Sequence, residues 1–279
     1  MNSCSKGTLI DYAFNKIKKI DYPFYIIFKN EKFANEIFTI YCFHLELSQI
    51  PAGSNNIETK QIRSNWWLES LQNIQKPQQK TSHPVISLIA EYFSHNNEII
   101  NSFQELVILR NKENELHGFK TNKQLSIYIE KTNFIIWHLI YEMINQCKAT
   151  KSKYDALIKF STGIKYVNIA SSLYYRDYNN HFFITSELTQ KFKNTAAKDK
   201  QELIFKLCCS LAKKELIEFI KTRTKDKDLK NFVIYSKLNK SRLHLLKNCY
   251  KNNINNIPPD VIIISTYLKI TLIRISLWI

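Results

Sequence analysis

The sequence predicts an all-α protein, with a single domain built from about eight to ten helices. Apolar residues recur three or four positions apart along most of the chain, and no useful stretch alternates with the period of two that marks a strand. Four glycines and six prolines in 279 residues are too few for the many tight turns of an all-β fold. Hydrophobic residues make up 44% and charged residues 23%, which indicates a globular protein rather than a disordered chain.

Helices in the N-terminal part follow from apolar periodicity and from breaker residues. An apolar stripe predicts a helix over Glu31–Leu47; its members are Phe33, Ile37, Ile40, Tyr41 and Leu45. Pro51 is expected to end this helix because proline cannot continue the backbone ladder. Before it, Pro23 is interpreted as a break between a polar start and an apolar cluster. Two further helices are predicted at Ile57–Ile74 and from His83-Pro84 to Phe93, with Pro84 in the first turn.

The remaining chain continues the helical pattern. The predicted helices are Asn101–Leu116, Asn122–Cys147, Asp155–Tyr178, Asp199–Thr224 and Leu229–Tyr250. A last apolar helix is predicted within residues 255–279. Lys269 and Arg274 interrupt it, and both charges would be costly inside a membrane. We therefore expect internal packing of this helix, with docking on a membrane surface as the alternative.

Charge and cysteine usage exclude several classes of protein. The formal net charge is +16, but the lysines are spread along the chain and no groove-reading or RNA-binding motif accompanies them. We therefore expect no nucleic-acid partner. The six cysteines lack CxxC spacing, which predicts free thiols in a reducing compartment, with Cys208 and Cys209 packed in the core. The start lacks the pattern of a signal peptide, so we expect a cytoplasmic, non-secreted protein, with peripheral attachment to the inner face of a membrane as a further option.

Common catalytic and cofactor motifs are missing from the sequence. There is no GxxxxGK[ST] and no GxGxxG, and the seven histidines never fall at HxxxH or HExxH spacing.

The adjacent Trp66 and Trp67 would point about 100° apart on a helix, so at least one of them should face the interior.

Three segments nevertheless resemble the squalene/phytoene synthase family. They are Tyr41-Cys-Phe-His-Leu-Glu46, Ile62-Arg-Ser-Asn-Trp-Trp67 and the start of the helix at His83-Pro84-Val85. Residues 165–188, KYVNIASSLYYRDYNNHFFITSEL, are similar to that family's second motif helix. The resemblance covers roughly residues 21–188 and implies the class I isoprenoid synthase fold. The pattern is closest to a divergent branch that includes a mitochondrial assembly factor of respiratory complex I.

The resemblance implies a magnesium site that this chain does not reproduce. Active members carry two Asp-x-x-x-Asp pairs, which hold Mg²⁺ and thereby ionise a prenyl diphosphate. Here the corresponding positions of the first motif are Ser48 and Ala52, and those of the second are Ser172 and Arg176. A cation at Arg176 would repel Mg²⁺, although it is also suited to contact a diphosphate directly.

We therefore expect no cofactor and no catalytic residue, and three hypotheses remain. The first is a non-catalytic protein that acts with subunits or assembly factors of a membrane respiratory complex, as the resemblance implies. The second is a Mg²⁺-dependent prenyltransferase with rearranged acids, for which the candidates are Glu46, Asp177, Glu113 and Glu115. The third is a module that binds a prenyl or lipid ligand in an apolar pocket. The residues expected to line that pocket are Phe43, Trp66, Trp67 and Tyr174.

Overall fold

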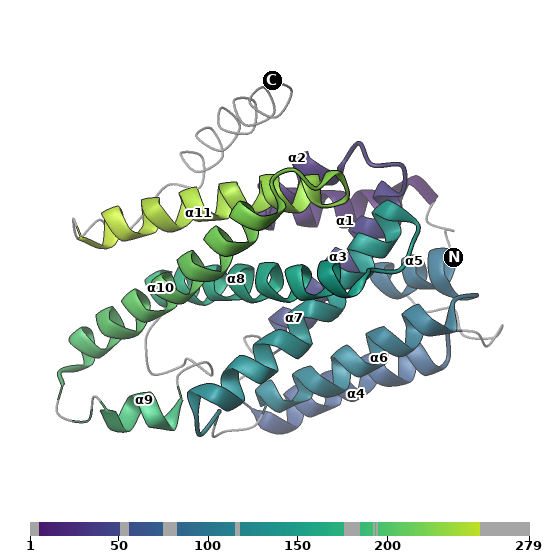
Figure 1. Ribbon diagram of the computed structural model, residues 1–279. Helices are drawn as coiled ribbons and strands as arrows, with labels where there is room; N and C mark the ends of the chain where they lie inside the picture. Colours follow the sequence, from purple (N-terminus) through teal and green to yellow (C-terminus); the bar gives the residue numbers. More distant parts are fainter. Residues whose placement is uncertain are drawn as a thin grey trace. The chain divides into compact units, whose positions relative to one another are not determined.

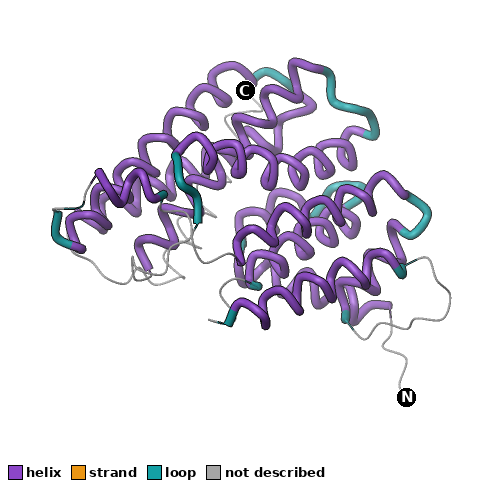
Figure 2. The backbone as a smooth tube through the Cα atoms, turned by 90° about the horizontal axis from the view of Figure 1, so that it is seen from below, coloured by secondary structure: helices purple, strands orange, loops and turns teal. Residues whose placement is uncertain are grey.

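The computed structural model describes residues 6–50, 56–74, 83–114, 118–175, 185–191, 193 and 195–251. Every regular element in these residues is a helix and none is a strand, which confirms the predicted all-α class (Figure 2). The chain divides into two compact units. The first unit consists of Met1–Leu116 and Ile135–Lys148, and the second of His117–Phe134 and Ala149–Ile279. The single domain expected from the sequence stays a prediction, and each unit is described separately below.

The first unit is built around α3, most of whose side chains are buried. Its helices are α1 (Lys6–Ile20), α2 (Tyr22–Phe28), α3 (Ala34–Gln49), α4 (Ile57–Gln72), α5 (Pro84–Phe93), α6 (Asn97–Asn111) and the C-terminal part of α7 (Asn122–Asn145). All side chains from Ile37 to Leu45 are buried, which is the pattern of a central helix rather than of a surface one. Helices α1 and α5 pack against α3, and α4 packs against α6.

Helix α2 corrects the interpretation of Pro23. The sequence led us to expect a break there, yet Pro23 lies in the first turn of α2, where its missing N–H and fixed φ are tolerated. Asp21 caps this helix by accepting a hydrogen bond from the Phe24 N–H at 3.1 Å. The Tyr41 hydroxyl donates to the other oxygen of Asp21 at 2.6 Å, and the rings of Phe24 and Tyr41 stack at 3.7 Å between centroids. These contacts fix α2 against α3.

The second unit is organised around a close contact of two long helices. It contains the N-terminal part of α7, α8 (Lys151–Tyr175), α9 (Ser186–Lys191), α10 (Ala197–Arg223) and α11 (Lys230–Lys251). Helix α8 lies along α10 and also contacts α11 (Figure 1). Gly163 makes the close approach of α8 to α10 feasible, because a Cβ atom there would lie 2.8 Å from Cδ2 of Leu216. The ring of Phe160 packs against Phe219 and Phe232 in the same core.

Most predicted helices exist, with ends that differ by a few residues. Three helices were missed: α1, α2 and the short α9. Free cysteines are found as expected, with Cys42, Cys208 and Cys209 buried, while Cys147 is exposed. The predicted last helix within residues 255–279 lies outside the described residues. Among the helices that the structure describes, none is long and apolar enough to cross a membrane.

Candidate functional site

The end of α3, where the first metal motif is expected, carries a serine turned back onto its own helix. Ser48 is exposed, and its hydroxyl donates to the carbonyl oxygen of Leu45 at 2.7 Å. Helix α3 ends at Gln49, and the described residues stop at Ile50. Pro51 and Ala52 therefore lie outside the described residues. A neutral hydroxyl that donates to a backbone carbonyl does not replace the charged carboxylate that magnesium prefers.

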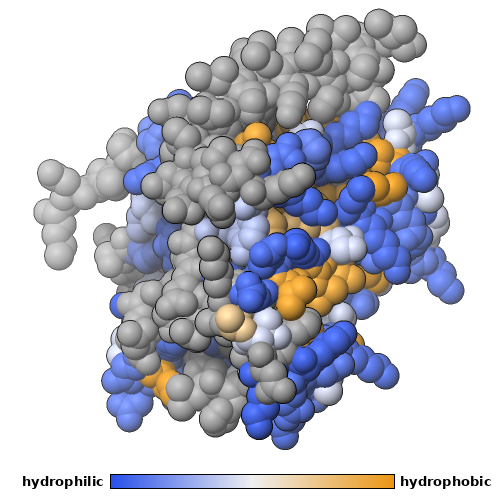
Figure 3. Space-filling model, turned by 90° about the vertical axis from the view of Figure 1, so that its left-hand side faces the viewer, coloured by the Kyte–Doolittle hydropathy of each residue, from blue (hydrophilic) through white to orange (hydrophobic). Residues whose placement is uncertain are grey.

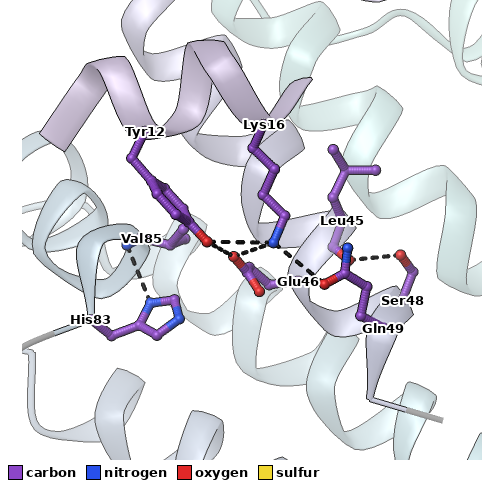
Figure 4. A network of polar contacts seen from close by, with 8 residues as sticks. All are labelled: Tyr12, Lys16, Leu45, Glu46, Ser48, Gln49, His83 and Val85. Carbon is purple, nitrogen blue, oxygen red and sulfur yellow. Dashed lines mark hydrogen bonds and ion pairs between the residues drawn. The ribbon is translucent and has the colours of Figure 1, made fainter. Parts of the chain in front are cut away.

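Glu46, the carboxylate nearest to that position, points toward α1 (Figure 4). Its Oε1 atom accepts a hydrogen bond from the Tyr12 hydroxyl at 2.6 Å and lies 2.5 Å from Nζ of Lys16. The Lys16 ammonium also reaches Oε1 of Gln49 at 3.4 Å. The side chains of Lys16 and Glu46 are only 14% and 13% exposed, so this ion pair is partly shielded from solvent. The charge of Glu46 is thus compensated within the chain.

This network and its burial keep two neighbouring acids neutral. Burial, reinforced by the hydrogen bond to Glu46, raises the pKa of the Tyr12 phenol well above its usual range. Burial also raises the pKa of the Cys42 thiol to about 12, and the charge of Glu46 adds to this effect. Both groups therefore stay protonated at neutral pH. Cys42 behaves as an inert core thiol rather than as a nucleophile.

A cavity of about 370 Å³ lies next to this network in the first unit. It is lined by Glu46, Gln49, Ile50, Ile62, Arg63, Trp66, Trp67 and His83. Trp67 is 5% exposed and Trp66 is 41% exposed, in agreement with the expectation that at least one of the pair faces the interior. The ring of His83 lies against both indoles, at 4.9 Å from Trp67 and 5.4 Å from Trp66. The cavity therefore has an aromatic wall and a polar side.

His83 has a structural role at this cavity. Its Nδ1 atom accepts a hydrogen bond from the Val85 N–H at 3.3 Å and so caps the start of α5 (Figure 4). An accepting Nδ1 carries no proton, which leaves the proton of the neutral ring on Nε2. Burial lowers the pKa of His83, so the neutral form that makes the cap is favoured.

The four residues expected to line a pocket are found in three different surroundings. Trp66 and Trp67 line the cavity of the first unit. Phe43 is fully buried and packs behind that wall, at 5.3 Å from Trp67 and 4.7 Å from Phe103. Tyr174 belongs to the second unit, where its ring lies 6.4 Å from that of Tyr250.

The second motif lies on α8 and also shows hydroxyls bonded within their helix. Ser171 is buried and donates to the carbonyl of Val167 at 2.9 Å, and Ser172 donates to that of Ile169 at 3.1 Å. Asn168 is exposed. The described part of α8 ends at Tyr175, so Arg176 and Asp177 lie outside it.

The residues described at these positions do not fit the Mg²⁺ that the resemblance implies. Magnesium sites in proteins are usually built on one or two carboxylates, whereas the two described motif positions carry the neutral hydroxyls of Ser48 and Ser172, both bonded to backbone carbonyls. No group of three or more His, Cys, Asp or Glu side chains that could hold a metal ion occurs in the part of the chain that the structure describes.

Sequence reasoning missed the partners of Glu46. Tyr12 and Lys16 belong to α1, which was interpreted as a polar start without a helix. Their spacing of four residues is a usable signal, since it places both side chains on one face of a helix. His83 was recognised only as the start of a helix, because its position beside Trp66 and Trp67 depends on tertiary packing.

Comparison with known proteins identifies the family. The model of the squalene/phytoene synthase family matches residues 17–217. A crystal structure of a dehydrosqualene synthase in complex with ligand is similar to this chain with a TM-score of 0.72, at 13% identity, and the match covers 96% of this chain and 97% of that one.

The squalene synthase HpnC from Alicyclobacillus acidocaldarius is similar with a TM-score of 0.63, at 12% identity, over 86% of this chain and 94% of that one. No curated protein matches the sequence. At these identities the two structures show a shared fold, the all-α isoprenoid synthase fold. Because the family match spans most of the sequence, the chain belongs to the squalene/phytoene synthase family.

Proposed function

We propose that this chain is a non-catalytic member of its family that acts in the assembly or maintenance of a membrane respiratory complex of the complex I type. The observation that carries the non-catalytic part is the end of α3. There the Ser48 hydroxyl is bonded to its own helix, and the Glu46 carboxylate is paired with Lys16 and Tyr12. A scaffold remains, while the group that would bind a metal at this position is missing.

The electrostatics of α3 argue against ionisation of a diphosphate at this place. To bind Mg²⁺, Glu46 would have to give up a partly buried ion pair and the hydrogen bond from Tyr12. Breaking this shielded pair is costly because it leaves the Lys16 ammonium without its counter-charge. The ammonium would also repel a divalent cation at Glu46. The loss of the ion pair and this repulsion both oppose metal binding at Glu46.

The role in complex assembly rests on the resemblance rather than on the cavity. The Ile62-Arg-Ser-Asn-Trp-Trp67 element is the part of the sequence closest to the branch with the assembly factor. A net charge of +16 favours attraction to an anionic membrane surface, which suits peripheral attachment at the inner face of a membrane. Subunits or assembly factors of the complex are the partners in this proposal.

A gene deletion tests this role. We expect the deletion strain to contain less assembled complex I, as measured by native gel electrophoresis with in-gel activity. The parent chain should restore the level, and so should Ser48→Ala, because the proposal assigns no metal chemistry to that hydroxyl. Normal complex levels in the deletion strain would overturn the role in assembly.

A prenyltransferase with rearranged acids is the first alternative, and family membership favours it. Of its four candidate acids the structure describes two in detail. Glu46 is paired with Lys16, and Glu113 is buried in the first unit. Turnover of farnesyl or geranylgeranyl diphosphate by the purified protein with Mg²⁺ would establish this alternative.

A module that binds an isoprenoid or lipid is the second alternative, and the cavity beside Trp66 and Trp67 favours it. An apolar ligand there should change indole fluorescence. Titration with farnesol should produce a saturable change that Trp66→Phe reduces. A signal without saturation would count against this alternative.

A further inference from the structure

The second unit contains a cavity that the proposed function does not use. It has a volume of about 300 Å³, which is at the lower end of the range for ligand sites. Helices α7, α8, α9 and α10 supply its walls. The lining residues are Asn122, Lys123, Leu125, Ser126, Tyr166, Ile169, Leu188, Ile204, Leu207, Cys208 and Leu211.

The interior of this cavity is apolar. Leucine and isoleucine side chains contribute most of the wall, and burial raises the pKa of the Cys208 thiol to about 12, so that this sulfur is neutral. The two hydroxyls in the lining, those of Ser126 and Tyr166, lie 3.3 Å apart and hydrogen-bond to each other. No buried polar group of the lining calls for a polar ligand in the interior.

Lys123 is the one charged residue in the lining, and none of the described residues forms an ion pair with it. Lys123 is exposed and makes no ion pair or hydrogen bond within the described residues. The Thr185 hydroxyl donates to Asn122 at 2.8 Å, and the Glu187 carboxylate, which keeps its negative charge, accepts from the Asn122 N–H at 2.9 Å but forms no ion pair with Lys123. Lys123 is therefore the one cation of the lining that is available to an anion from outside.

Apolar surface continues from the cavity to the outside of α10. Leu207 lines the cavity and is 37% exposed, and Leu203, one turn before it, is exposed to the same extent. Figure 3 shows apolar side chains open to view between hydrophilic ones on the face that it presents. From Ile204 to Leu211 the lining extends over roughly 10 Å of helix, a length that suits a hydrocarbon chain better than a compact ring.

We propose that this cavity binds the hydrocarbon chain of a medium-chain carboxylate, with the carboxylate placed at Lys123. The charge balance selects this class. One ammonium without an ion-pair partner among the described residues matches a single negative charge, whereas a diphosphate would need more cations than the lining supplies. A cationic amphiphile would be repelled. The site lies entirely within the second unit, and the inference does not depend on the proposed function.

Calorimetric titration of the full chain with decanoate, decanol and decyltrimethylammonium tests the charge preference. Decanoate should bind with a stoichiometry of one and more tightly than decanol, and the ammonium compound should not bind. From octanoate to nonanoate to decanoate, affinity should rise about fourfold per methylene group until the cavity is filled. Absence of decanoate binding, or equal binding of all three head groups, would overturn the proposal.

Four variants locate the site. Ser126 lies at an exposed position of α7, and Ser126→Trp should fill part of the cavity with a large side chain. Decanoate binding should then weaken by at least about tenfold. Ser126→Ala adds no bulk to the cavity and should weaken decanoate binding far less than Ser126→Trp, which separates filling of the cavity from loss of the hydroxyl. Lys123→Gln should weaken decanoate by about two- to fivefold and leave decanol unchanged. Lys131→Gln, at an exposed position of α7 outside the lining, is the matched control.

Two outcomes of the variant series would contradict the site. Decanoate binding that survives Ser126→Trp, while circular dichroism shows that the variant is folded, would place the ligand elsewhere. Binding to phosphatidylglycerol vesicles without binding to monomeric decanoate would indicate a membrane-docking surface instead of a ligand site.

Discussion

The two cavities are similar in volume, about 370 and 300 Å³, but they differ in how their charges are balanced. In the first unit, the lining holds Glu46, which is paired with Lys16 and Tyr12, and the exposed Arg63, which makes no ion pair within the described residues. In the second unit, the interior is apolar, and Lys123, the one charged residue of the lining, makes no ion pair within the described residues. The comparison shows that a carboxylate beside a cavity, such as Glu46, does not by itself indicate a metal or ligand site, because the chain can supply its counter-charge.

The cavity walls also differ in construction. Aromatic rings form the wall in the first unit, where Trp67 packs against Phe43 and His83. In the second unit, α8 and α10 carry aliphatic residues into the cavity, and elsewhere along the same pair of helices Gly163 allows close contact with Leu216. Substitutions in each wall should therefore act by different mechanisms.

Truncation of the aromatic wall should have the largest effect. Trp67→Ala removes a buried indole and should lower the free energy of unfolding by about 3–5 kcal/mol. Trp66→Ala removes an indole that is 41% exposed and should cost below about 1 kcal/mol. Urea denaturation of the two variants measures the difference, and equal losses would contradict the assignment of Trp67 as the structural member of the pair.

Addition of one methyl group should disturb the contact of α8 with α10. A Cβ atom at Gly163 would lie 2.8 Å from Cδ2 and 2.9 Å from Cγ of Leu216, which is itself fully buried. The resulting overpacking should cost about 1–3 kcal/mol, more than the roughly 1 kcal/mol that alanine gains over glycine in a helix.

A double-mutant cycle checks the cause of this loss. In urea denaturation, Gly163→Ala should be less harmful in a Leu216→Ala background than in the parent chain, because the truncated leucine no longer meets the new methyl group. A net stabilisation by Gly163→Ala alone would show that α8 and α10 are not in close contact at this point.

Removal of the Glu46 charge should destabilise the first unit. Glu46→Gln leaves the Lys16 ammonium without a counter-charge in partly shielded surroundings, and we expect a loss of about 1–3 kcal/mol at neutral pH. Adding Lys16→Met should restore most of it. The exposed pair of Lys148 with Glu98 supplies the control, since Glu98→Gln should cause no measurable change in thermal unfolding. Full tolerance of Glu46→Gln would mean that the pair is not formed.

The cap at His83 should make stability depend on pH. Burial lowers the pKa of His83 in the folded protein, so the unfolded chain binds a proton first as the pH falls below about 6.5. The stability that neutral His83 contributes is therefore fully present above about pH 6.5 and is lost as the pH falls toward the lower pKa of this group in the folded protein. His138, whose pKa burial also lowers, acts in the same direction, so only the difference between parent and variant isolates His83.

Two variants separate titration from capping. His83→Asn keeps a capping side chain without a titrating group and should flatten the loss of stability between pH 7 and pH 5. His83→Ala removes the cap and should cost about 0.5–2 kcal/mol at pH 7. Thermal unfolding across this pH range measures both effects. An unchanged pH dependence in His83→Asn would assign the titration to another group.

Much of the fold was accessible from the sequence because periodicity and caps are local signals. The helix predicted at Ile57–Ile74 appears at Ile57–Gln72, and the one predicted at Asp199–Thr224 appears at Ala197–Arg223. Helix α2 was missed because Pro23 was interpreted as a break, whereas the cap that makes it a starting residue comes from Asp21. Helix α9 has only six residues, too few for a periodic pattern.

The candidate site was less predictable because it depends on which helices meet. The replacement of the metal-motif acids by Ser48 and Ser172 could be recognised from the aligned pattern alone. The pairing of Glu46 with Lys16 joins residues 30 positions apart, and the aromatic wall joins Trp67 to His83 across two helices. The cavity at Lys123 collects residues of four helices, so no local pattern could indicate it.

Magnesium-dependent release of diphosphate from geranylgeranyl diphosphate distinguishes a non-catalytic chain from a working prenyltransferase. The purified chain should show no release above the rate without enzyme, at any Mg²⁺ concentration, because the end of α3 offers a bonded hydroxyl and a compensated carboxylate. Sustained release that EDTA stops and Glu46→Gln abolishes, in a variant shown to be folded, would contradict the account and establish a prenyltransferase with rearranged acids.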